Sequence, residues 1–274
     1  MTITVVVPTR DRPVHLAACL AALRAELRAD DELLVVDSFS EHPVPEAAIR
    51  APALGASLAR NLGWQAAARD VVAFVDDDAQ VATGWRSALE AALPGVDAVC
   101  GRVAVPLAQQ GIERPVAVTA DVPAQALSTG SSLRGVSANL VVRRTALELV
   151  GGFDERLGPG TWSRAGEDLE LQDRLLRAGL VVRYEPSVLA FHDQWRSRRE
   201  LLRLDYGYGV GAGARAAWTG GPAGRAVLRE GLWDNGIRPV GHDLRIGYQF
   251  GALTGLVRAA GTCVGAARGW RRRP

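Results

Sequence analysis

Lysine is absent from this sequence: none of the 274 residues is a lysine, so arginine carries every fixed positive side-chain charge. This absence excludes any mechanism that needs a catalytic or phosphate-binding lysine. Net charge is also scarce, at +2 for the whole chain. A balance this close to zero gives no reason to expect a general basic surface, and nucleic acid is therefore not an expected partner.

Cysteines and long hydrophobic runs are also few. The three cysteines, Cys19, Cys100 and Cys263, are odd in number and too scattered for a metal site, which indicates buried thiols in a reducing compartment. No basic segment precedes the first apolar run, so no secretory signal is expected. No window of about 18 apolar residues is seen, so no membrane span is expected. These absences predict a cytoplasmic protein and leave open a peripheral position at the inner face of the membrane.

The first 103 residues alternate between two hydrophobic periods. Short apolar runs predict buried strands, and three- to four-residue spacing predicts helices between them; the strands are expected at 3–7, 33–36, 71–75 and 96–103, and the helices at 11–27, 55–69 and 84–93. Strands that alternate with helices are typical of βαβ units. The predicted fold class is therefore α/β, with a mostly parallel sheet flanked by helices.

The rest of the chain has a different rhythm. Residues 104–136 are rich in Pro, Gly, Ser and Thr, which predicts a long functional or mobile loop. Strands are then expected at 138–142, 181–184 and 188–191, helices at 145–150 and 167–178, and glycine-broken helices after 197. We expect three parts: 1–103, 104–196 and a helical extension at 197–274.

Charged or imidazole side chains follow several predicted strands where those strands end. In an open parallel sheet, ligands bind at the carboxyl ends of the strands. The sharpest of these groups is Asp76-Asp77-Asp78, after the strand VVAFV. Three adjacent carboxylates repel one another unless they are solvated or neutralised. The triplet therefore indicates a Mg²⁺ or Mn²⁺ site that organises a diphosphate, and a solvated acidic turn is the alternative interpretation.

Longer segments resemble a known family, the family 2 glycosyltransferases. Its nucleotide-sugar half is similar to VVVPTRDRPVHLAACLAAL, LLVVDSFS and GASLARNLGWQAAARDVVAFVDDDA, and its acceptor half to SANLVVRRTALELVGGFDERLG and GEDLELQDRLLRAGLVVRYEPSVLAFH. The resemblance extends from about residue 3 to about residue 213. It implies a GT-A-type, Rossmann-like fold and inverting transfer from a nucleoside-diphosphate sugar, with UDP or dTDP as the expected nucleotide.

The resemblance also implies roles on the donor side. Nucleotide-sugar contacts are expected from Pro8, Thr9, Arg10, Asp37, Arg60, Asp76 and Asp77. Within this set, Asp37 matches the acid that hydrogen-bonds the nucleobase, and Asp76 opens the D-x-D motif. Asp78, with Asp76 and His192, matches the metal ligands. For His192, a hydrogen-bonded, partly exposed imidazole at a strand end is an equal alternative.

Acceptor-side roles come from the same resemblance. Asp168 matches the catalytic base and Glu167 its acidic neighbour, although acids at a helix start also stabilise the helix dipole without any catalytic role. Asn139 and Trp162 are candidate acceptor contacts, with a strand-edge amide and ordinary loop packing as the alternatives. The family's common second acid is Ser38 here, so recognition of the base would depend on Asp37.

The predicted activity is metal-dependent, inverting transfer of a hexose or deoxyhexose to an acceptor hydroxyl. The Q-x-x-R-W element of processive synthases is absent, so the transfer is expected to be non-processive. A sugar-nucleotide pyrophosphorylase is the alternative enzyme, but it would want a glycine-rich N-terminal signature and a lysine. A non-catalytic sugar-nucleotide-binding protein is the alternative from another class. Small-molecule, peptide and lipid-linked acceptors all stay open.

The C-terminal segment lies outside the resemblance. An apolar seam recurs at helical spacing through Ile246, Phe250, Leu253, Val257, Ala260 and Val264, and Gly247, Gly251 and Gly255 form a second line. Arg245 and Arg258 interrupt any run of membrane length, and arginines 268 and 271–273 end the chain. Three outcomes are possible: docking on the protein's own core, a homodimer seam, or peripheral contact with an anionic membrane.

Overall fold

The structure, a computed structural model, describes residues 1–112, 114–131 and 133–272. The chain folds into two compact units. The sheet unit contains Met1–Asp154 and Asp168–Gln194, and the helical unit contains Glu155–Glu167 and Trp195–Pro274. Loop 155–167, which the sequence assigned to the acceptor half, therefore folds with the C-terminal helices.

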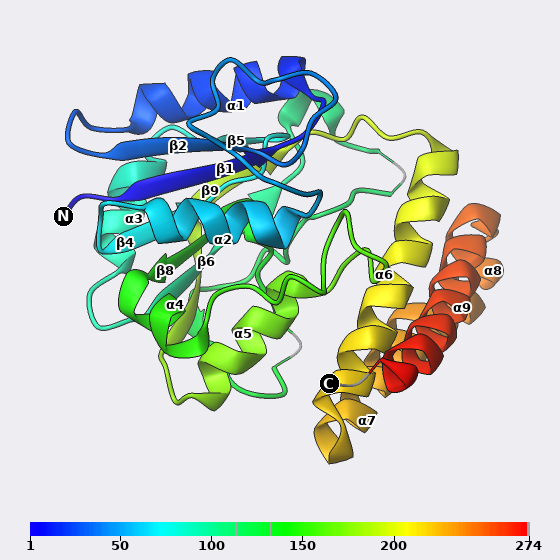
Figure 1. Cartoon of the computed structure of the whole chain (residues 1–274). Coiled ribbons are helices and arrows are strands. Elements are labelled where there is room, and N and C mark those ends of the chain that lie inside the picture. The colour runs from blue at the N-terminus through cyan, green and yellow to red at the C-terminus, as the bar shows by residue number, and fades with distance from the viewer. Residues whose placement is uncertain (113, 132, 273–274) are drawn as a thin grey trace. The chain divides into compact units, whose positions relative to one another are not determined.

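The described residues of the sheet unit form one nine-stranded sheet (Figure 1). Its strands are β1 (Thr4–Thr9), β2 (Glu32–Asp37), β3 (Ile49–Arg50), β4 (Val71–Phe74), β5 (Ala79–Val81), β6 (Ala98–Ala104), β7 (Gln125–Ala126), β8 (Leu140–Arg143) and β9 (Val182–His192). The order is β3-β2-β1-β4-β8-β6-β9-β5, and β7 pairs with β9. The pairs from β3 to β4 are parallel, whereas β8 runs antiparallel to both of its neighbours.

Helices cover both faces of this sheet, as the α/β prediction requires. They are α1 (Pro13–Glu26), α2 (Ala56–Ala66), α3 (Trp85–Ala92), α4 (Arg144–Val150) and α5 (Glu167–Arg177), with short 3₁₀ turns at Leu107–Gln109 and Ser137–Asn139. Leu20 of α1 and Trp85 of α3 share a core with Val5 and Val7, while Trp64 of α2 and Leu171 of α5 share the other core. Successive side chains of a strand point to opposite faces, so β1 supplies both cores.

The short pairings are what the sequence analysis did not predict. The strands β3, β5 and β7 have two or three residues each, too few for a hydrophobic period. The two strands expected at 181–184 and 188–191 are one strand, β9, which crosses Pro186 at a register shift opposite Gly101/Arg102. A bulge of this kind lets a proline sit inside a paired strand.

The helical unit is built on glycine. Its elements are α6 (Arg198–Thr219), α7 (Gly221–Arg229), a π-helical segment η3 (Glu230–Ile237), α8 (Arg238–Arg245) and α9 (Gln249–Arg271). A Cβ on Gly213 of α6 would lie 2.1 Å from the carbonyl oxygen of Thr262, and one on Gly265 of α9 would lie 2.1 Å from that of Val210. Only glycine allows these two helix backbones to approach so closely.

The docked face of α9 differs from the one that the apolar seam suggested. Gly261, Gly265 and Gly269 are buried, while Leu253 and Ala260 of the seam are exposed. Of the predicted glycine line, Gly255 packs against the backbone of Gly236. The helix docks within the chain, but it does so with its small residues because they allow the closest approach.

The expectation that no segment has membrane length needs a correction. By length and composition, α9 is long and apolar enough to cross a membrane, with a mean hydropathy of 1.3 over its best window. Within the structure, 44% of that window is buried. A core helix of a folded unit meets the same test, so the finding is weak evidence for a membrane segment.

Candidate active site

The acidic triplet lies at the carboxyl end of β4, as predicted. Asp77 and Asp78 are buried, and Asp76 is a quarter exposed at its side chain. The chain leaves the triplet directly into β5, where Ala79 pairs with His192 of β9. This short antiparallel pairing is the reason that His192, far away in the sequence, reaches the triplet.

Asp77 is held by Thr9, the last residue of β1, and by Arg12, three residues later. The Thr9 hydroxyl donates a hydrogen bond to its Oδ2 at 2.7 Å, and the Arg12 guanidinium donates to its Oδ1 at 2.9 Å. Arg12 also reaches Asp78 at 3.1 Å. Burial raises the pKa of Asp77, and the charge of Asp78 adds to that rise, while Arg12 opposes it. Arg12 therefore partly neutralises the two buried carboxylates.

A chain of hydrogen bonds orients Asp78. Gln194 accepts from the backbone N–H of Val116 at 2.8 Å and donates to the carbonyl of the same residue at 3.1 Å, which fixes its amide orientation. Its Nε2 also donates to the carbonyl of His192 at 2.8 Å and lies 3.2 Å from Nδ1 of that ring. The other ring nitrogen of His192, Nε2, lies 3.2 Å from Oδ1 of Asp78.

The positive charge of Arg60 acts on both Asp76 and Asp168. The Arg60 guanidinium of α2 pairs with Asp76 at 2.7 Å and lies over the Phe153 ring, 5.5 Å from its centre. Asp168 stands in the first turn of α5, where it accepts a hydrogen bond from the backbone N–H of Leu169. Burial raises the pKa of Asp168, as does the negative charge of Asp76, and Arg60 limits the rise.

The expected nucleobase end is also in place. Asp37 is 1% exposed at the end of β2; its Oδ1 accepts from the Ser40 N–H at 2.8 Å, and its Oδ2 pairs with Arg50 at 3.1 Å. Pro8 lies in β1 in register with Val36. Arg10 is half exposed and pairs with Asp11 at 3.2 Å. Arg10 thus faces solvent, while Arg12, two residues later, contacts the triplet.

Other predicted residues lie elsewhere. Asn139 is fully buried: its amide donates to the carbonyls of Arg102 and Val188 and accepts from the Trp85 indole, so the side chain is used inside the core. Trp162 belongs to the helical unit, where its ring meets that of Trp218 edge to face at 5.7 Å. Glu167 is buried and is also assigned to the helical unit.

The carboxylates suit a divalent cation better than the imidazole does. Within 1–112, 114–131 and 133–272, no three His, Cys, Asp or Glu side chains gather closely enough to hold a metal ion alone. Mg²⁺ and Mn²⁺ fit a site of one or two carboxylates, because they retain water and take phosphate oxygens as further ligands. Asp78 and Asp76 offer such oxygens. Nε2 of His192 lies 3.2 Å from Oδ1 of Asp78, close enough to orient that carboxylate.

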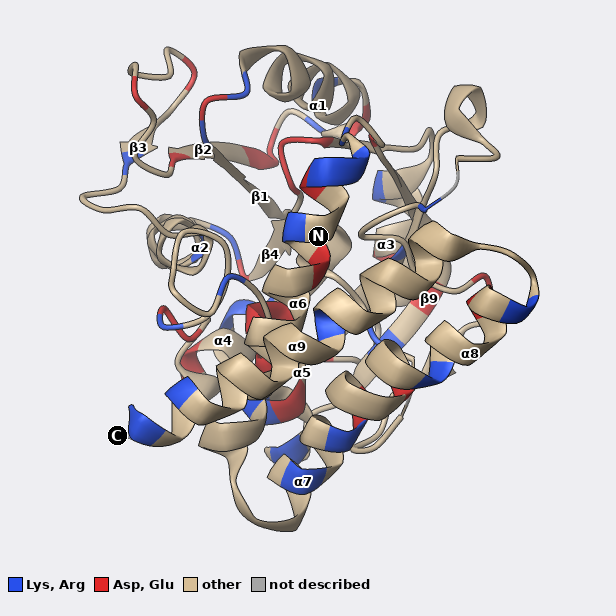
Figure 2. Cartoon of the chain, turned by 90° about the vertical axis from the view of Figure 1, so that its right-hand side faces the viewer, with Lys and Arg blue, Asp and Glu red and all other residues tan. Residues whose placement is uncertain are grey.

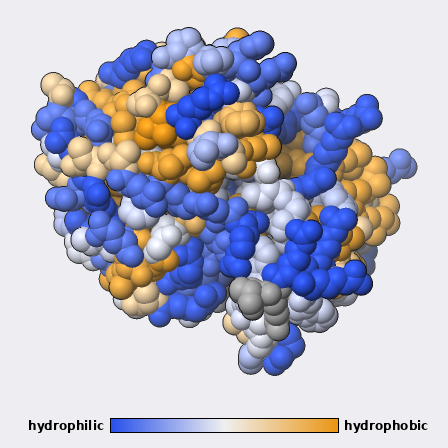
Figure 3. All heavy atoms as spheres, in the orientation of Figure 1, coloured by the Kyte–Doolittle hydropathy of each residue, from blue (hydrophilic) through white to orange (hydrophobic). Residues whose placement is uncertain are grey.

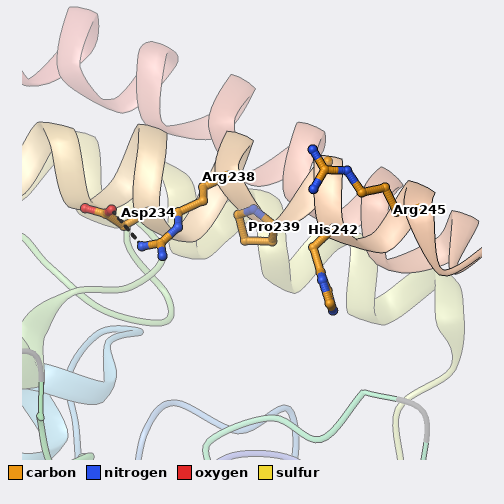
Figure 4. A pocket seen from close by; sticks show the side chains of 6 residues that line it. Asp234, Arg238, Pro239, His242 and Arg245 are labelled. Carbon is orange, nitrogen blue, oxygen red and sulfur yellow. Dashed lines mark ion pairs between the residues drawn. The ribbon is translucent and has the colours of Figure 1, made fainter.

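A hollow on the helical unit is separate from these residues. Its volume is about 590 Å³, and it is lined by Asp234, Arg238, Pro239, Gly241, His242 and Arg245. In Figure 4, Arg238 and His242 project to the same side of α8, and Arg238 pairs with Asp234 at 3.8 Å. No residue expected from the sequence to bind donor, metal or acceptor lines it.

Part of the chain matches a known protein family. Residues 4–117 match a family described as Glycosyl transferase family 2. Two strains of Mycobacterium tuberculosis have a curated pre-mycofactocin glycosyltransferase that is 32% identical over 251 residues, covering 83% of this chain and 48% of the relative. The matching segment, which contains the acidic triplet, belongs to glycosyltransferase family 2. The chain spans about half the length of the curated relatives that it matches.

Solved glycosyltransferases share the fold at low identity. A mannosyltransferase, PcManGT from Pyrobaculum calidifontis in complex with GDP-Man and Mn²⁺, has a TM-score of 0.62 at 16% identity, covering 99% of this chain and 88% of its own. S. aureus TarS 1–349 with UDP-GlcNAc has a TM-score of 0.56 at 15% identity, covering 97% and 92%. The predicted GT-A-type fold is thereby confirmed.

Three side chains of the site were missed by the sequence analysis. Arg12 follows the predicted Arg10 by two residues, and only the turn after β1 decides which of them points inward. Gln194 follows His192 by two residues, a spacing that places both on one side of an extended chain and could have signalled it. Arg50, on the two-residue strand β3, carried no signal.

Proposed function

We propose that this protein is a family 2 glycosyltransferase and moves a hexose or deoxyhexose from a nucleoside-diphosphate sugar to an acceptor hydroxyl, one residue at a time and with inversion. The observation that carries the proposal is the buried Asp77–Asp78 pair at the end of β4, held from three sides by Thr9, Arg12 and His192. Buried acids so firmly oriented are costly for stability unless they serve a ligand.

The donor would bind along the carboxyl ends of β2, β1 and β4. Asp37 would receive the nucleobase, exchanging its Arg50 pairing for base N–H groups. Thr9 and Arg12 would hold the acids while the ribose and diphosphate settle beside Asp76 and Asp77. UDP and dTDP are the proposed nucleotides. Among the structural neighbours, GalNAc-T7 was solved with UDP, GalNAc and Mn²⁺, which supports a donor and a cation of these classes.

A divalent cation completes the proposed donor site. Asp78 and Asp76 would hold it, and it would supply positive charge against the leaving diphosphate. The chain's own task is to hold and aim these carboxylates. Arg12 and Arg60 do so electrostatically, and the Gln194–His192 pair does so by hydrogen bonding.

Asp168 is the proposed base. An inverting transfer needs a group that accepts the acceptor's hydroxyl proton while the oxygen attacks the anomeric carbon. Burial and Asp76 raise the pKa of Asp168, which makes its carboxylate a better proton acceptor than a solvated one. Arg60 pairs with Asp76 at 2.7 Å, and its positive charge opposes the rise in the pKa of Asp168.

The first test is donor binding. Thermal-shift titration with UDP, dTDP and GDP should show stabilisation that depends on Mn²⁺ for at least one nucleotide. Asp78→Ala should remove the Mn²⁺-dependent part, and Asp121→Ala, which removes an exposed acid, should keep it. Unchanged Mn²⁺ dependence in the Asp78 variant would refute the metal assignment.

The second test is turnover. An acceptor screen with the preferred donor should give a product whose anomeric configuration is opposite to that of the donor, as read by NMR. A retained configuration would exclude the direct displacement proposed here. Binding without turnover on any acceptor would instead favour a sugar-nucleotide-binding protein.

A further inference from the structure

The outward face of α9 exposes large apolar side chains. The helix docks through buried small residues such as Gly261 and Gly265. Its large apolar side chains therefore point outward: Leu253 is 45% exposed, Leu256 53% and Trp270 62%. Buried small residues and exposed large ones are the reverse of a helix that serves only its own core.

The same segment carries positive charge only. Asp243 is the last acidic residue of the chain, and the 31 residues after it include six arginines. Since the whole chain has a net charge of +2, the first 243 residues carry −4. Arg258 pairs inward with Asp205, so the outward face is uncharged until Arg268 and Arg271 at its end, as the long tan stretches of α9 in Figure 2 show. Arg273 lies outside the described residues.

Other large apolar residues are exposed on elements that pack against α9. Leu244 and Ile246, at the end of α8, are 59% and 63% exposed, and Trp233 of η3 is 51% exposed. Figure 3 shows hydrophobic residues at the edge of the molecule where α8 and α9 lie, beside hydrophilic ones. Large apolar side chains, tryptophans and terminal arginines are the composition of a helix that lies in a membrane interface.

Charge decides between the occupants that this surface could have. A second copy would bring the same arginine-ended face, with no acidic residue after Asp243 to pair with it. In an anionic lipid bilayer, the headgroup phosphates can pair with the arginines, and the boundary between headgroups and acyl chains can accommodate the leucines. We propose that the outward face of α9, defined by Leu253, Leu256, Trp270, Arg268 and Arg271, is a peripheral docking surface for anionic lipid bilayers.

The docking is parallel to the surface. The inward side of α9 is occupied by α6, through contacts such as that between Gly265 and Val210. Arg258, the charged residue in the middle of α9, is paired with Asp205. Lifting α9 out of this packing to span a bilayer would leave Asp205 buried without Arg258, whereas lying on the bilayer leaves the pair intact.

The experiment uses the full chain and two kinds of vesicle. Sedimentation with phosphatidylglycerol–phosphatidylcholine vesicles at low salt should recover the protein, and pure phosphatidylcholine should recover much less. Leu253→Glu/Leu256→Glu should weaken binding to the anionic vesicles by roughly tenfold or more. Leu149→Glu is the matched control, because Leu149 is 66% exposed on α4 of the sheet unit. Arg268→Gln/Arg271→Gln should lower binding and flatten its dependence on salt.

The contrary outcomes are distinct. Full-length protein that ignores anionic vesicles at low salt overturns the proposal, as does equal loss in the Leu149 control. A dimer in light scattering that the double Glu variant dissociates, without vesicle binding, assigns the face to a second copy instead. Circular dichroism and Mn²⁺-dependent nucleotide binding show that each variant is folded, so a failure of donor binding cannot be mistaken for a failure of docking.

Discussion

The two units of this chain are packed in opposite ways, one around large side chains and the other through glycines. The sheet unit fills both faces of its sheet with large side chains, among them Trp85, Leu89 and Phe74, all 0–1% exposed. The helical unit brings α6 and α9 together through glycines such as Gly213 and Gly265, whose missing side chains let backbone meet backbone. A core of large side chains leaves polar residues at strand ends for chemistry. A glycine seam leaves large apolar residues on the outside.

The buried charges differ in the same way. In the sheet unit, Asp77, Asp78 and Asp76 gather around Arg12 and Arg60 at one edge of the sheet. In the helical unit, the buried Asp205 pairs with Arg258, and the buried Arg215 pairs with Glu230. Converging carboxylates can take a ligand together, whereas these two ion pairs contribute one acid each. The site therefore belongs to the sheet unit, and the variants below test that separation.

The largest effect is expected at Asp168. Asp168→Asn should lower turnover by roughly 10²- to 10⁴-fold, the usual scale for loss of a general base, with donor affinity unchanged. Asp173→Asn on the same helix is the control, because Asp173 pairs with Arg177 at 3.6 Å and has no proposed part in transfer. Steady-state kinetics and calorimetric donor titration measure the two quantities. Near-normal turnover in the Asp168 variant would move the base elsewhere.

The next effect concerns the orientation of Asp78. Gln194→Leu removes the donor to His192 and the clamp on Val116, so Mn²⁺ affinity in the presence of nucleotide should fall by about 10- to 100-fold. Gln80→Leu, on the exposed side of β5, should leave it unchanged. Nitrogen-15 NMR of the metal-free protein should show His192 protonated at Nε2. A proton on Nδ1 instead would restore the metal-ligand hypothesis for His192.

Alanine substitutions at two glycines of the helical unit, one packed between α6 and α9 and one open to solvent, should have opposite effects on stability. Gly213→Ala places a Cβ 2.1 Å from the carbonyl oxygen of Thr262, which should lower the free energy of unfolding by about 1–3 kcal/mol. Gly241→Ala in α8 meets nothing within 4 Å and should raise it by about 0.5–1 kcal/mol, because alanine is the better helix former. Chemical denaturation followed by circular dichroism compares them. Equal effects would mean that the seam is not tightly packed.

The smallest effect concerns the loop at 155–167. The Arg272 guanidinium lies 5.3 Å from the Trp162 ring centre, and Arg156 lies 4.6 Å from that of Trp218. An exposed cation–π contact contributes about 0.5–1 kcal/mol, so Arg272→Gln should speed trypsin cleavage after Arg156 and Arg164 a few-fold. Arg268→Gln is the control. Identical cleavage rates in both variants would show that the tail does not restrain this loop.

The segments with a clear local pattern could be predicted from the sequence, whereas strand direction could not. The longer helices α1, α2, α3 and α5 were predicted correctly, because helical spacing of apolar residues, alanine-rich composition or a closing glycine marks these segments. The triplet at 76–78 and its place at a strand end were equally visible. The parallel pairing of β1 with β2 and β4 was also expected. The antiparallel insertion of β8 was not, because strand direction within a sheet depends on partners far along the chain.

The site residues divide along the same line. Asp37, Asp76 and Asp78 stand where strands end, so their positions followed from local pattern. Arg12 meets an acid 65 residues away, and Gln194 is held by Val116, 78 residues away. Asn139 shows the converse: its strand-edge position was compatible with an acceptor contact, but the fold buried it and used its amide inside. Polar type and spacing cannot say which way a side chain faces.

By itself, the sequence determined the α/β class, the acidic strand end and the absence of any lysine mechanism, because composition and periodicity are properties of the chain alone. Only the tertiary structure decided that Arg12 rather than Arg10 meets the acids, that Gln194 joins Val116 to His192, and that α9 turns its glycines inward. Each of these depends on contacts between distant segments, where the closest packing and the best-satisfied hydrogen bonds override local preference.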